Sequence, residues 1–346
     1  MSALAPLIRA FEAAPAPDFL KRAAISALVE KARRDMARNP GQSDADFAQA
    51  MTNFAIAEHV EAANDQHYEL PAAFFEKILG PHLKYSSCLY PSGAESLGEA
   101  EARALEETAR HADLKNGQKV LELGCGWGSL SLWMARTFPN STILSVSNSA
   151  SQRAFIESRA SAEGLSNLTV RTCDMNDFDA GDGLFDRVVS VEMFEHMANW
   201  RGLLSRVHRW IRPEGRLFLH VFSHKSQAYR FDAADPDDWI GQHFFTGGIM
   251  PSHGLIKEFG DLFELEADWR WNGSHYARTA RDWLANFDAA EKEIMPLLRT
   301  VYGAQAGVWK ARWRLFFLAT EGLFGHAEGE EWAVSHYRLL PAPKKS

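Results

Sequence analysis

The feature that most constrains the fold is an alternation of short apolar runs with helical segments. Runs rich in β-branched or apolar residues are separated by stretches that have the apolar spacing of amphipathic helices. This alternation predicts βαβ units and a parallel sheet that helices cover on both faces. We therefore expect an α/β chain built on a doubly wound, Rossmann-like sheet, with strands at residues 119–123, 142–147, 168–172, 185–191 and 216–222.

The two ends of the chain differ from this core. Residues 1–80 have helical character, and within the helical stretch 43–64 Ser43 is a candidate N-cap, with Asp46 at the third helical position. A further helix is expected at 95–113 and a final strand at 330–340. We divide the chain into an N-terminal helical segment at 1–90, a Rossmann-like core at 91–225, and C-terminal helices with final sheet strands at 226–346.

Composition disfavours several classes of protein. The formal net charge of −8 argues against a nucleic-acid partner, because phosphate binding needs a basic face. No apolar run approaches the ~20 residues of a membrane span, and the first residues lack the apolar segment of a secretory signal. Cys88, Cys125 and Cys173 include no C-x-x-C pair, so neither a disulfide framework nor a metal site is predicted. We expect a reducing, cytoplasmic compartment.

Residues 120–136, VLELGCGWGSLSLWMAR, have the order strand, glycine turn, helix. The glycines let the backbone come close to a ligand at the start of the helix. The spacing G-x-G-x-G differs from the dinucleotide fingerprint G-x-G-x-x-G, because Ser129 stands at the sixth position. The form E-L-G-x-G-x-G is seen in S-adenosylmethionine-dependent methyltransferases, and the alternative is a structural turn in an unrelated α/β protein. The residues expected to bind the cofactor here are Glu122, Gly124, Gly126 and Gly128.

Nucleoside-binding sheets usually carry an acid at the end of the second strand, where it binds ribose hydroxyls. Here that strand ends with Ser147 and Asn148, whose side chains can form similar hydrogen bonds. Asp174, after the third strand, is placed either to meet the adenine or to cap a turn. The further residues expected at the cofactor are Tyr85, Ser86, Gln152 and Met175.

Several motifs occur in an order that resembles one protein family. The stretches HYELPAAFFEKILGPHLKYSSCLY, LELGCGWGSLSLW, SVSNSASQ, FDRVVSVEMFEHM and HYARTARDW together resemble the cyclopropane-fatty-acid synthase family of methyltransferases. SVEMFEHMANW, DDWIGQHFFTGGIMPS and EGEEWAVSHY look closer to its coclaurine N-methyltransferase branch. The resemblance implies a class I methyltransferase fold with a helical lid and S-adenosylmethionine as the cofactor. It also implies a lid role for the motif that begins at His67 and Tyr68.

In lipid-cyclopropanating members of this family, a bicarbonate ion acts as the base. It is held by a cysteine, a glutamate, a histidine, an isoleucine and a tyrosine. The resemblance places the glutamate at Glu195, the histidine at His220 and the tyrosine at Tyr276. Ser87 and Phe222 stand at the cysteine and isoleucine positions, which disfavours cyclopropanation.

The stretch VVSVEMFEHM, residues 188–197, places two acids and a histidine where a buried strand ends. The coclaurine branch carries Glu192, Glu195 and His196 as functional groups, and the end of a parallel strand is where α/β sheets bind ligands. Methyl transfer to an amine needs a free lone pair aligned with the methyl carbon. We expect both acids on one face of a helix's first turn, where they hold the ammonium, with His196 as base or relay. The alternative is that the helix dipole alone favours the acids.

Aromatic side chains gather in the C-terminal part of the chain. Their π faces suit a methylated cation, but the same residues could line an acyl-chain tunnel or belong to the core. Residues 307–324 combine aromatic with basic side chains, as in a packed helix with a solvated basic face or a helix at a membrane surface. The residues expected to line the acceptor pocket are Trp239, Phe244, Phe245 and Trp271, with Trp283 nearby.

Three hypotheses about function follow from these motifs. The leading one is an S-adenosylmethionine-dependent methyltransferase that acts on the nitrogen of a small, aromatic or benzylisoquinoline-like amine. The second is methylation or cyclopropanation of an unsaturated fatty acyl chain, and the third is a non-catalytic S-adenosylmethionine-binding module, which the intact acids and histidine disfavour. The glycine spacing and the missing second-strand acid disfavour an NAD dehydrogenase. A homodimer is the assembly we consider.

Overall fold

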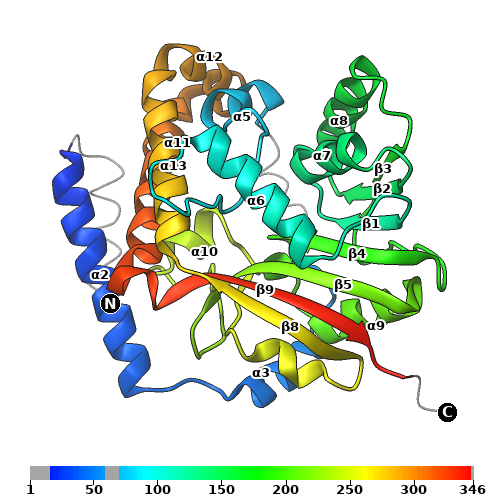
Figure 1. The fold of residues 1–346 in the computed structure, drawn as a ribbon. Coiled ribbons are helices and arrows are strands. Elements are labelled where there is room, and N and C mark those ends of the chain that lie inside the picture. Colours follow the sequence, from blue (N-terminus) through cyan, green and yellow to red (C-terminus); the bar gives the residue numbers. More distant parts are fainter. Residues whose placement is uncertain (1–15, 59–69, 344–346) are drawn as a thin grey trace.

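A computed structural model describes residues 16–58 and 70–343 of the 346-residue chain. Its centre is a seven-stranded sheet with the order β3-β2-β1-β4-β5-β9-β8 (Figure 1). The first five strands are parallel, and β9 runs antiparallel to both of its neighbours. The predicted doubly wound α/β fold is therefore confirmed. The strands are β1 (Lys119–Leu123), β2 (Thr142–Ser147), β3 (Leu168–Thr172), β4 (Phe185–Val191), β5 (Ile211–His224), β8 (Phe263–Trp271) and β9 (Trp332–Pro341).

The strands of the parallel core agree closely with the sequence pattern. The bounds of β1 to β4 are the predicted ones, whereas β5 extends beyond 216–222 at both ends. The final predicted strand is β9, which begins two residues later than expected. The pattern does not predict β8, because this strand lies at the edge of the sheet and most of its side chains are only partly buried or exposed.

Helices cover both faces of the sheet because its central strands are apolar on both sides. In β4, Val188 packs in one cluster with α9 (Trp200–Trp210). The neighbouring Val189 packs with α6 (Leu97–His111) and α7 (Ser129–Thr137) on the opposite face. Beside α7, α8 (Ala150–Ala162) covers β2 and β3 (Figure 1). A continuous apolar run such as VVSV is buried in this way from both sides.

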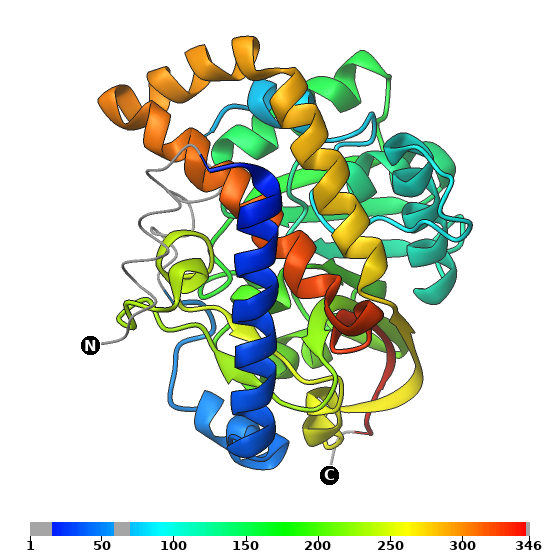
Figure 2. The same cartoon turned by 90° about the vertical axis from the view of Figure 1, so that its left-hand side faces the viewer.

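The C-terminal helices form a group that lies over the sheet together with α5 (Ala72–Ile78) (Figure 1). They are α11 (Ser274–Ala289), α12 (Glu291–Tyr302) and α13 (Ala306–Phe324). The long N-terminal helix α2 (Asp18–Arg38) packs along α13, as Figure 2 shows. Segments from both ends of the chain therefore join in one helical layer.

The aromatic and basic stretch 307–324 forms most of α13. Its aromatic side chains Trp313 and Phe317 are buried in the helical layer. Its basic side chains pair with acids, because Arg314 contacts Asp18 at 3.0 Å and Asp288 at 2.7 Å. These contacts agree with a packed helix that has a solvated basic face. Among the helices of the described residues, none combines the length and the apolar character needed to cross a bilayer.

The N-terminal predictions have mixed outcomes. Ser43 caps α3 (Asp44–Met51), since its hydroxyl oxygen accepts the Asp46 N–H at 3.1 Å. This helix ends at Met51, so the longer helix expected over 43–64 is wrong for residues 52–58. His67 and Tyr68 lie outside the described residues. The division of the chain at residues 90 and 225 stays a prediction.

The short elements are α10 (Trp239–His243), β6 (Tyr229–Arg230), β7 (Ile249–Met250) and the 3-10 turns η1 (Phe194–His196), η2 (Leu255–Phe259), η3 (Gly303–Gln305) and η4 (His326–Gly329).

Candidate active site

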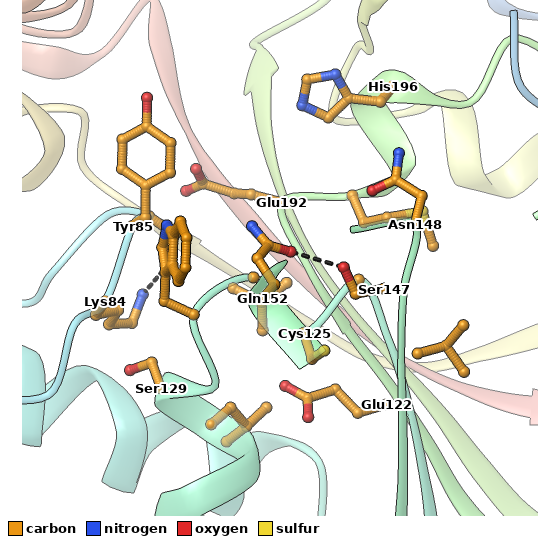
Figure 3. Close-up of a pocket in the computed structure, with 18 of the residues that line it drawn as sticks. Lys84, Tyr85, Glu122, Cys125, Ser129, Ser147, Asn148, Gln152, Glu192 and His196 are labelled. Carbon is orange, nitrogen blue, oxygen red and sulfur yellow. Dashed lines mark hydrogen bonds between the residues drawn. The ribbon is translucent and has the colours of Figure 1, made fainter. Parts of the chain in front are cut away.

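A cavity lies at the C-terminal edge of the parallel strands, between the sheet and helices α11 and α13. Figure 3 shows side chains from separate strands and loops converging on it. Its glycine-loop half is formed by residues at the ends of β1, β2 and β3 and just after them, represented by Glu122, Gly126, Ser147, Gln152 and Asp174. Its aromatic half is formed by Glu192, His196, Phe222, Phe245, Tyr276, Trp283 and Phe316.

The glycine loop between β1 and α7 follows the predicted order of strand, turn and helix. Gly124, Gly126 and Gly128 have φ angles of 78°, 50° and 82°, which side chains rarely adopt. A Cβ atom on Gly124 would lie 2.6 Å from Met193, and one on Gly128 would lie 2.6 Å from Ile156. A Cβ atom on Gly126 would meet no atom within 4 Å. Gly126 therefore borders open space in the cavity, whereas the other two glycines permit close packing.

Neutral hydrogen-bond donors face this half of the cavity. The Ser147 hydroxyl donates to Gln152 Oε1 at 2.6 Å and accepts the Ser149 N–H at 3.0 Å. This leaves Gln152 Nε2 buried with no hydrogen-bond partner among the described residues, as are Trp127 Nε1 and Ser129 Oγ. A buried donor without an acceptor costs about 1–3 kcal/mol. These groups fit a ligand that carries hydroxyl and carboxylate oxygens, such as a nucleoside with an amino-acid tail.

All residues expected to bind the cofactor line this cavity except Gly128. Glu122 is also an internal support, because its carboxylate accepts hydrogen bonds from Ser131 and, at 2.7 Å, from Ser145. Burial raises the pKa of this carboxyl group. Asp174 lines the cavity and also accepts the Asn176 N–H at 2.7 Å, so it caps a turn as well. The remaining lining residues of the prediction are Tyr85, Ser86, Asn148 and Met175.

In the aromatic half, the carboxylate of Glu192 is held at three points. The chain turns at Glu192 with a φ of 48°, a left-handed conformation that is uncommon outside glycine. Its Oε1 atom accepts the Ser87 N–H at 2.9 Å and lies 3.1 Å from His220 Nε2. Its Oε2 atom accepts the Tyr276 hydroxyl at 2.6 Å. The structure therefore brings together three of the predicted catalytic residues, Glu192, His220 and Tyr276.

The titration of these groups is dominated by burial. Burial raises the pKa of Glu192, although the charge of Lys84 and the Tyr276 and Ser87 hydrogen bonds oppose the shift. Burial also holds the pKa of His220 well below its usual range, with the charge of Lys84 acting in the same direction. His220 is thus neutral, and its Nε2 atom can donate to an ionised Glu192 or accept from a protonated one. The pKa of Tyr276 lies well above its usual range, so the phenol keeps its proton.

Glu195 does not share a helix face with Glu192, so that expectation is wrong. The strand continues to Val191, the chain turns at Glu192, and only the 3-10 turn η1 follows. Glu195 is fully buried, its Oε1 accepts the Phe222 N–H at 2.6 Å, and it is absent from the cavity lining. Burial, together with the charge of Glu192, raises its pKa well above the usual range. Glu195 is therefore a buried neighbour of the carboxylate in the cavity, and burial favours its neutral form.

His196 and the aromatic residues complete this half. The His196 ring lines the cavity opposite Tyr85 in Figure 3 and stacks on Phe245, with ring centroids 4.9 Å apart. Of the four aromatic residues expected to line the acceptor pocket, only Phe245 does so. Trp239 and Phe244 pack together in the core beneath α13, and Trp271 packs against His336. The sequence pattern does not separate these three residues from lining residues, because apolar periodicity is the same for a cavity wall and for the core behind it.

Sequence reasoning missed several lining residues, of which Phe316 and Lys84 bear most on the chemistry. Phe316 reaches the cavity from α13, and Lys84 reaches it from the segment before α6. Lys84 is buried, and its ammonium donates to Ser86 Oγ at 2.5 Å and to the Ser87 carbonyl at 2.6 Å. The buried carboxylate of Glu101 accepts three backbone N–H groups of this segment, those of Gly80, His82 and Lys84. The lysine that precedes YSS in the sequence could have indicated this group. Its burial depends on Glu101, 17 residues further along the chain, whose carboxylate accepts the Lys84 N–H.

Three of the five residues that the resemblance assigns to a bicarbonate site bond to Glu192, and the other two bond to each other. The Ser87 backbone, His220 and Tyr276 all bond to the carboxylate of Glu192, and the Phe222 N–H bonds to Glu195. Groups that would hold a carboxylate-shaped ion are thus occupied by a carboxylate of the chain itself. Among the described residues, no group of three or more histidines, cysteines or acids is placed to hold a metal ion.

Five parallel strands, an antiparallel β9 between β5 and β8, and a glycine loop after β1 define a class I S-adenosylmethionine-dependent methyltransferase fold. The model of the mycolic acid cyclopropane synthetase family matches residues 57–327. The chain belongs to this family.

Relatives in both branches of the family are similar to the chain. It is 36% identical to (S)-coclaurine N-methyltransferase of Thalictrum flavum subsp. glaucum over 292 residues, which cover 83% of this chain and 81% of that protein. It is 32% identical to cyclopropane-fatty-acyl-phospholipid synthase of Escherichia coli K12 over 266 residues, covering 73% and 66%. A crystal structure of coclaurine N-methyltransferase bound to N-methylheliamine and SAH superposes with a TM-score of 0.89 at 32% identity, covering 98% of this chain and all of that one.

Proposed function

We propose that the protein is an S-adenosylmethionine-dependent N-methyltransferase whose acceptor is a small benzylisoquinoline-like amine. The observation that carries this proposal is the carboxylate of Glu192 in an aromatic-walled cavity next to the glycine loop. A carboxylate attracts an ammonium group, and aromatic faces attract its cationic N-methylated product. The relatives named as N-methyltransferases and the structure bound to N-methylheliamine support this acceptor class.

The glycine-loop half suits the cofactor. Gly126 leaves room for close approach, and Gln152 and Asn148 supply neutral donors at the place where a ribose would lie. When bound, S-adenosylmethionine supplies a methyl group activated on a sulfonium. The structural relative bound to SAH supports the same cofactor.

The aromatic half suits the acceptor. Glu192 holds the ammonium form of the amine, and either Glu192 or His196 takes its proton. The freed lone pair then forms a bond to the methyl carbon as the sulfur–carbon bond breaks. The stacking of His196 on Phe245 fixes the ring on the wall of the cavity, so both polar groups are oriented before the amine enters.

Cyclopropanation of an acyl chain is the second candidate, because the chain is also similar to a phospholipid cyclopropane synthase. The arrangement around Glu192 disfavours it. A bicarbonate ion would need the hydrogen-bond donors that Glu192 already uses, namely the Ser87 N–H, His220 and Tyr276. The expected cytoplasmic compartment and the homodimer stay predictions.

One experiment separates the two candidates. The protein is incubated with methyl-labelled S-adenosylmethionine and either heliamine or vesicles of monounsaturated phospholipid, each with and without added bicarbonate. We expect label in N-methylheliamine at a rate that bicarbonate does not change. Label in a ring-bearing acyl chain, rising with bicarbonate, would reverse the ranking. No labelled product, although calorimetry detects bound cofactor, would support a non-catalytic binding module.

A further inference from the structure

A chain of three buried histidines connects Glu192 to the protein surface. His220 Nε2 lies 3.1 Å from Glu192 Oε1, and His220 Nδ1 lies 2.8 Å from His336 Nε2. His336 Nδ1 lies 2.7 Å from His111 Nδ1. His111 Nε2 lies 3.1 Å from Glu107 Oε1 and 2.8 Å from Nη2 of Arg110, a donor on an exposed side chain. Each ring uses both of its nitrogens. The side chain of Glu107 is 28% exposed, whereas that of His111 is 1% exposed, so the chain begins in the cavity and ends at solvent.

Three segments that are distant in sequence, β5, β9 and α6, supply the residues of this chain. His220 and His336 are direct cross-strand partners in the antiparallel pair β5–β9. His111 is the last residue of α6, and Glu107 lies one turn earlier on that helix. Cross-strand partners have side chains close together, and residues four apart share a helix face. The register of β9 against β5 therefore decides whether the chain is continuous.

Aromatic rings surround the chain and separate it from solvent. Trp269 stacks on His111 at 3.7 Å between ring centroids, with the ring planes 8° apart. Trp271 lies 4.3 Å from the His336 ring, and Phe218 meets the same ring edge-on at 5.1 Å. A buried polar chain of this length is costly unless every member is bonded, and here every ring is.

We propose that Glu107, His111, His336 and His220 form a proton path that carries the acceptor's proton from Glu192 to solvent. The proposal rests on the proposed function, because methylation of a protonated amine must release one proton per turnover. It assigns the proton to Glu192 rather than to His196. His220, His336 and His111 do not touch the acceptor, so they are relay and positioning residues.

The two protonation patterns of the path differ by the net transfer of one proton from Glu192 to Glu107. In the first, Glu192 is protonated and donates to His220, each ring donates to the next, and His111 donates to the Glu107 carboxylate after the exposed Arg110 guanidinium has moved away from His111 Nε2. When each proton crosses one hydrogen bond, Glu192 becomes a carboxylate and Glu107 becomes an acid, which then releases its proton to water. Every ring has one N–H before and after the shift, so no charged histidine accumulates.

Burial, together with the positive charges nearby, favours the neutral form of the three histidines. Burial lowers the pKa of His111 to about 4, with Arg110 and Arg338 acting in the same direction and Glu107 opposing them. Burial also keeps the pKa of His220 and His336 well below the usual range, aided by Lys84. A neutral imidazole has one donor and one acceptor nitrogen, which is what a relay member needs.

The test interrupts the path at two places and compares heliamine turnover in weak buffer. His336→Phe removes the middle ring, and His111→Phe removes the outer ring while leaving the Glu192–His220 contact in place. His224→Phe is the matched control, because His224 is a buried histidine of β5 that bonds to Glu331 and lies outside the path. Circular dichroism and cofactor calorimetry check that each variant is folded.

We expect each path variant to lose on the order of tenfold to a hundredfold in kcat. The double variant should be no slower than the slower single one, because one break already interrupts the path. Imidazole in solution should restore part of the rate in the path variants and should not raise the rate of His224→Phe.

Folded path variants that keep the parent kcat in weak buffer would overturn the proposal and leave the N-methyltransferase function intact. Additive losses without imidazole rescue would also overturn it, because they would indicate a purely structural role for the histidines. If the parent protein methylates no amine, the proposed function itself fails.

Discussion

The two halves of the cavity bind by different physical means. The glycine-loop half offers open space at Gly126 and neutral donors at Gln152 and Ser129. Its acids, Glu122 and Asp174, already accept hydrogen bonds from the chain itself. The aromatic half contains a carboxylate held by three hydrogen bonds and surrounded by rings. One half therefore selects by shape and the other by charge.

This difference matters because the two halves respond differently to substitution. A site that selects by shape fails when its space is filled, even if no charge changes. A site that selects by charge fails when the charge is removed, even if the shape stays. Cofactor binding and turnover of the acceptor can be measured separately for each variant, so the two responses can be compared.

Filling the space at Gly126 should have the largest effect. In Gly126→Val, the side chain enters the open part of the cavity, and we expect calorimetry to detect no binding of S-adenosylmethionine or SAH. The matched control is Gly164→Val, because Gly164 also has a positive φ, of 69°, and a Cβ atom added there would meet no atom within 4 Å, but it lies outside the cavity lining. Both variants carry a backbone strain of about 1–2 kcal/mol, so only the cavity distinguishes them. Equal binding losses in both would assign the effect to strain.

The cofactor half was largely predictable because its signals are local. A strand, three glycines and a helix follow one another within residues 119–137, and the loop geometry follows from their order. The aromatic half takes Glu192, Phe222, Phe245, Tyr276 and Phe316 from five separate segments. Which of its aromatics face the cavity depends on how α13 packs, so Phe245 was found while Phe316 was missed. Glu192 and Glu195 point in different directions because the backbone at Glu192 is left-handed. An acidic residue type does not predict that conformation.

Removing the charge of Glu192 should have the second largest effect. Glu192→Gln keeps the shape of the side chain but loses the attraction for an ammonium group. Loss of a buried charge partner costs about 2–5 kcal/mol, or roughly 30- to several-thousand-fold in kcat/KM for heliamine. The Kd for S-adenosylmethionine should stay within a few-fold of the parent value, because the charge belongs to the other half. A comparable loss of cofactor affinity would show that the halves are not separable.

Glu195→Gln should have the smallest effect on turnover, although Glu195 is only three residues from Glu192. Burial and the charge of Glu192 raise the pKa of Glu195 well above its usual range, which favours the neutral acid that glutamine resembles. We expect kcat/KM within a few-fold of the parent value. A raised folded-state pKa means that Glu195 contributes stability at low pH and loses that contribution as pH rises through the folded-state value. Because glutamine cannot ionise, the melting temperature of Glu195→Gln should match the parent at low pH and exceed it increasingly as the pH is raised, in calorimetric scans of both proteins. A loss of turnover equal to that of Glu192→Gln would instead mean that Glu195 is ionised and holds the acceptor, as the sequence motif alone predicts.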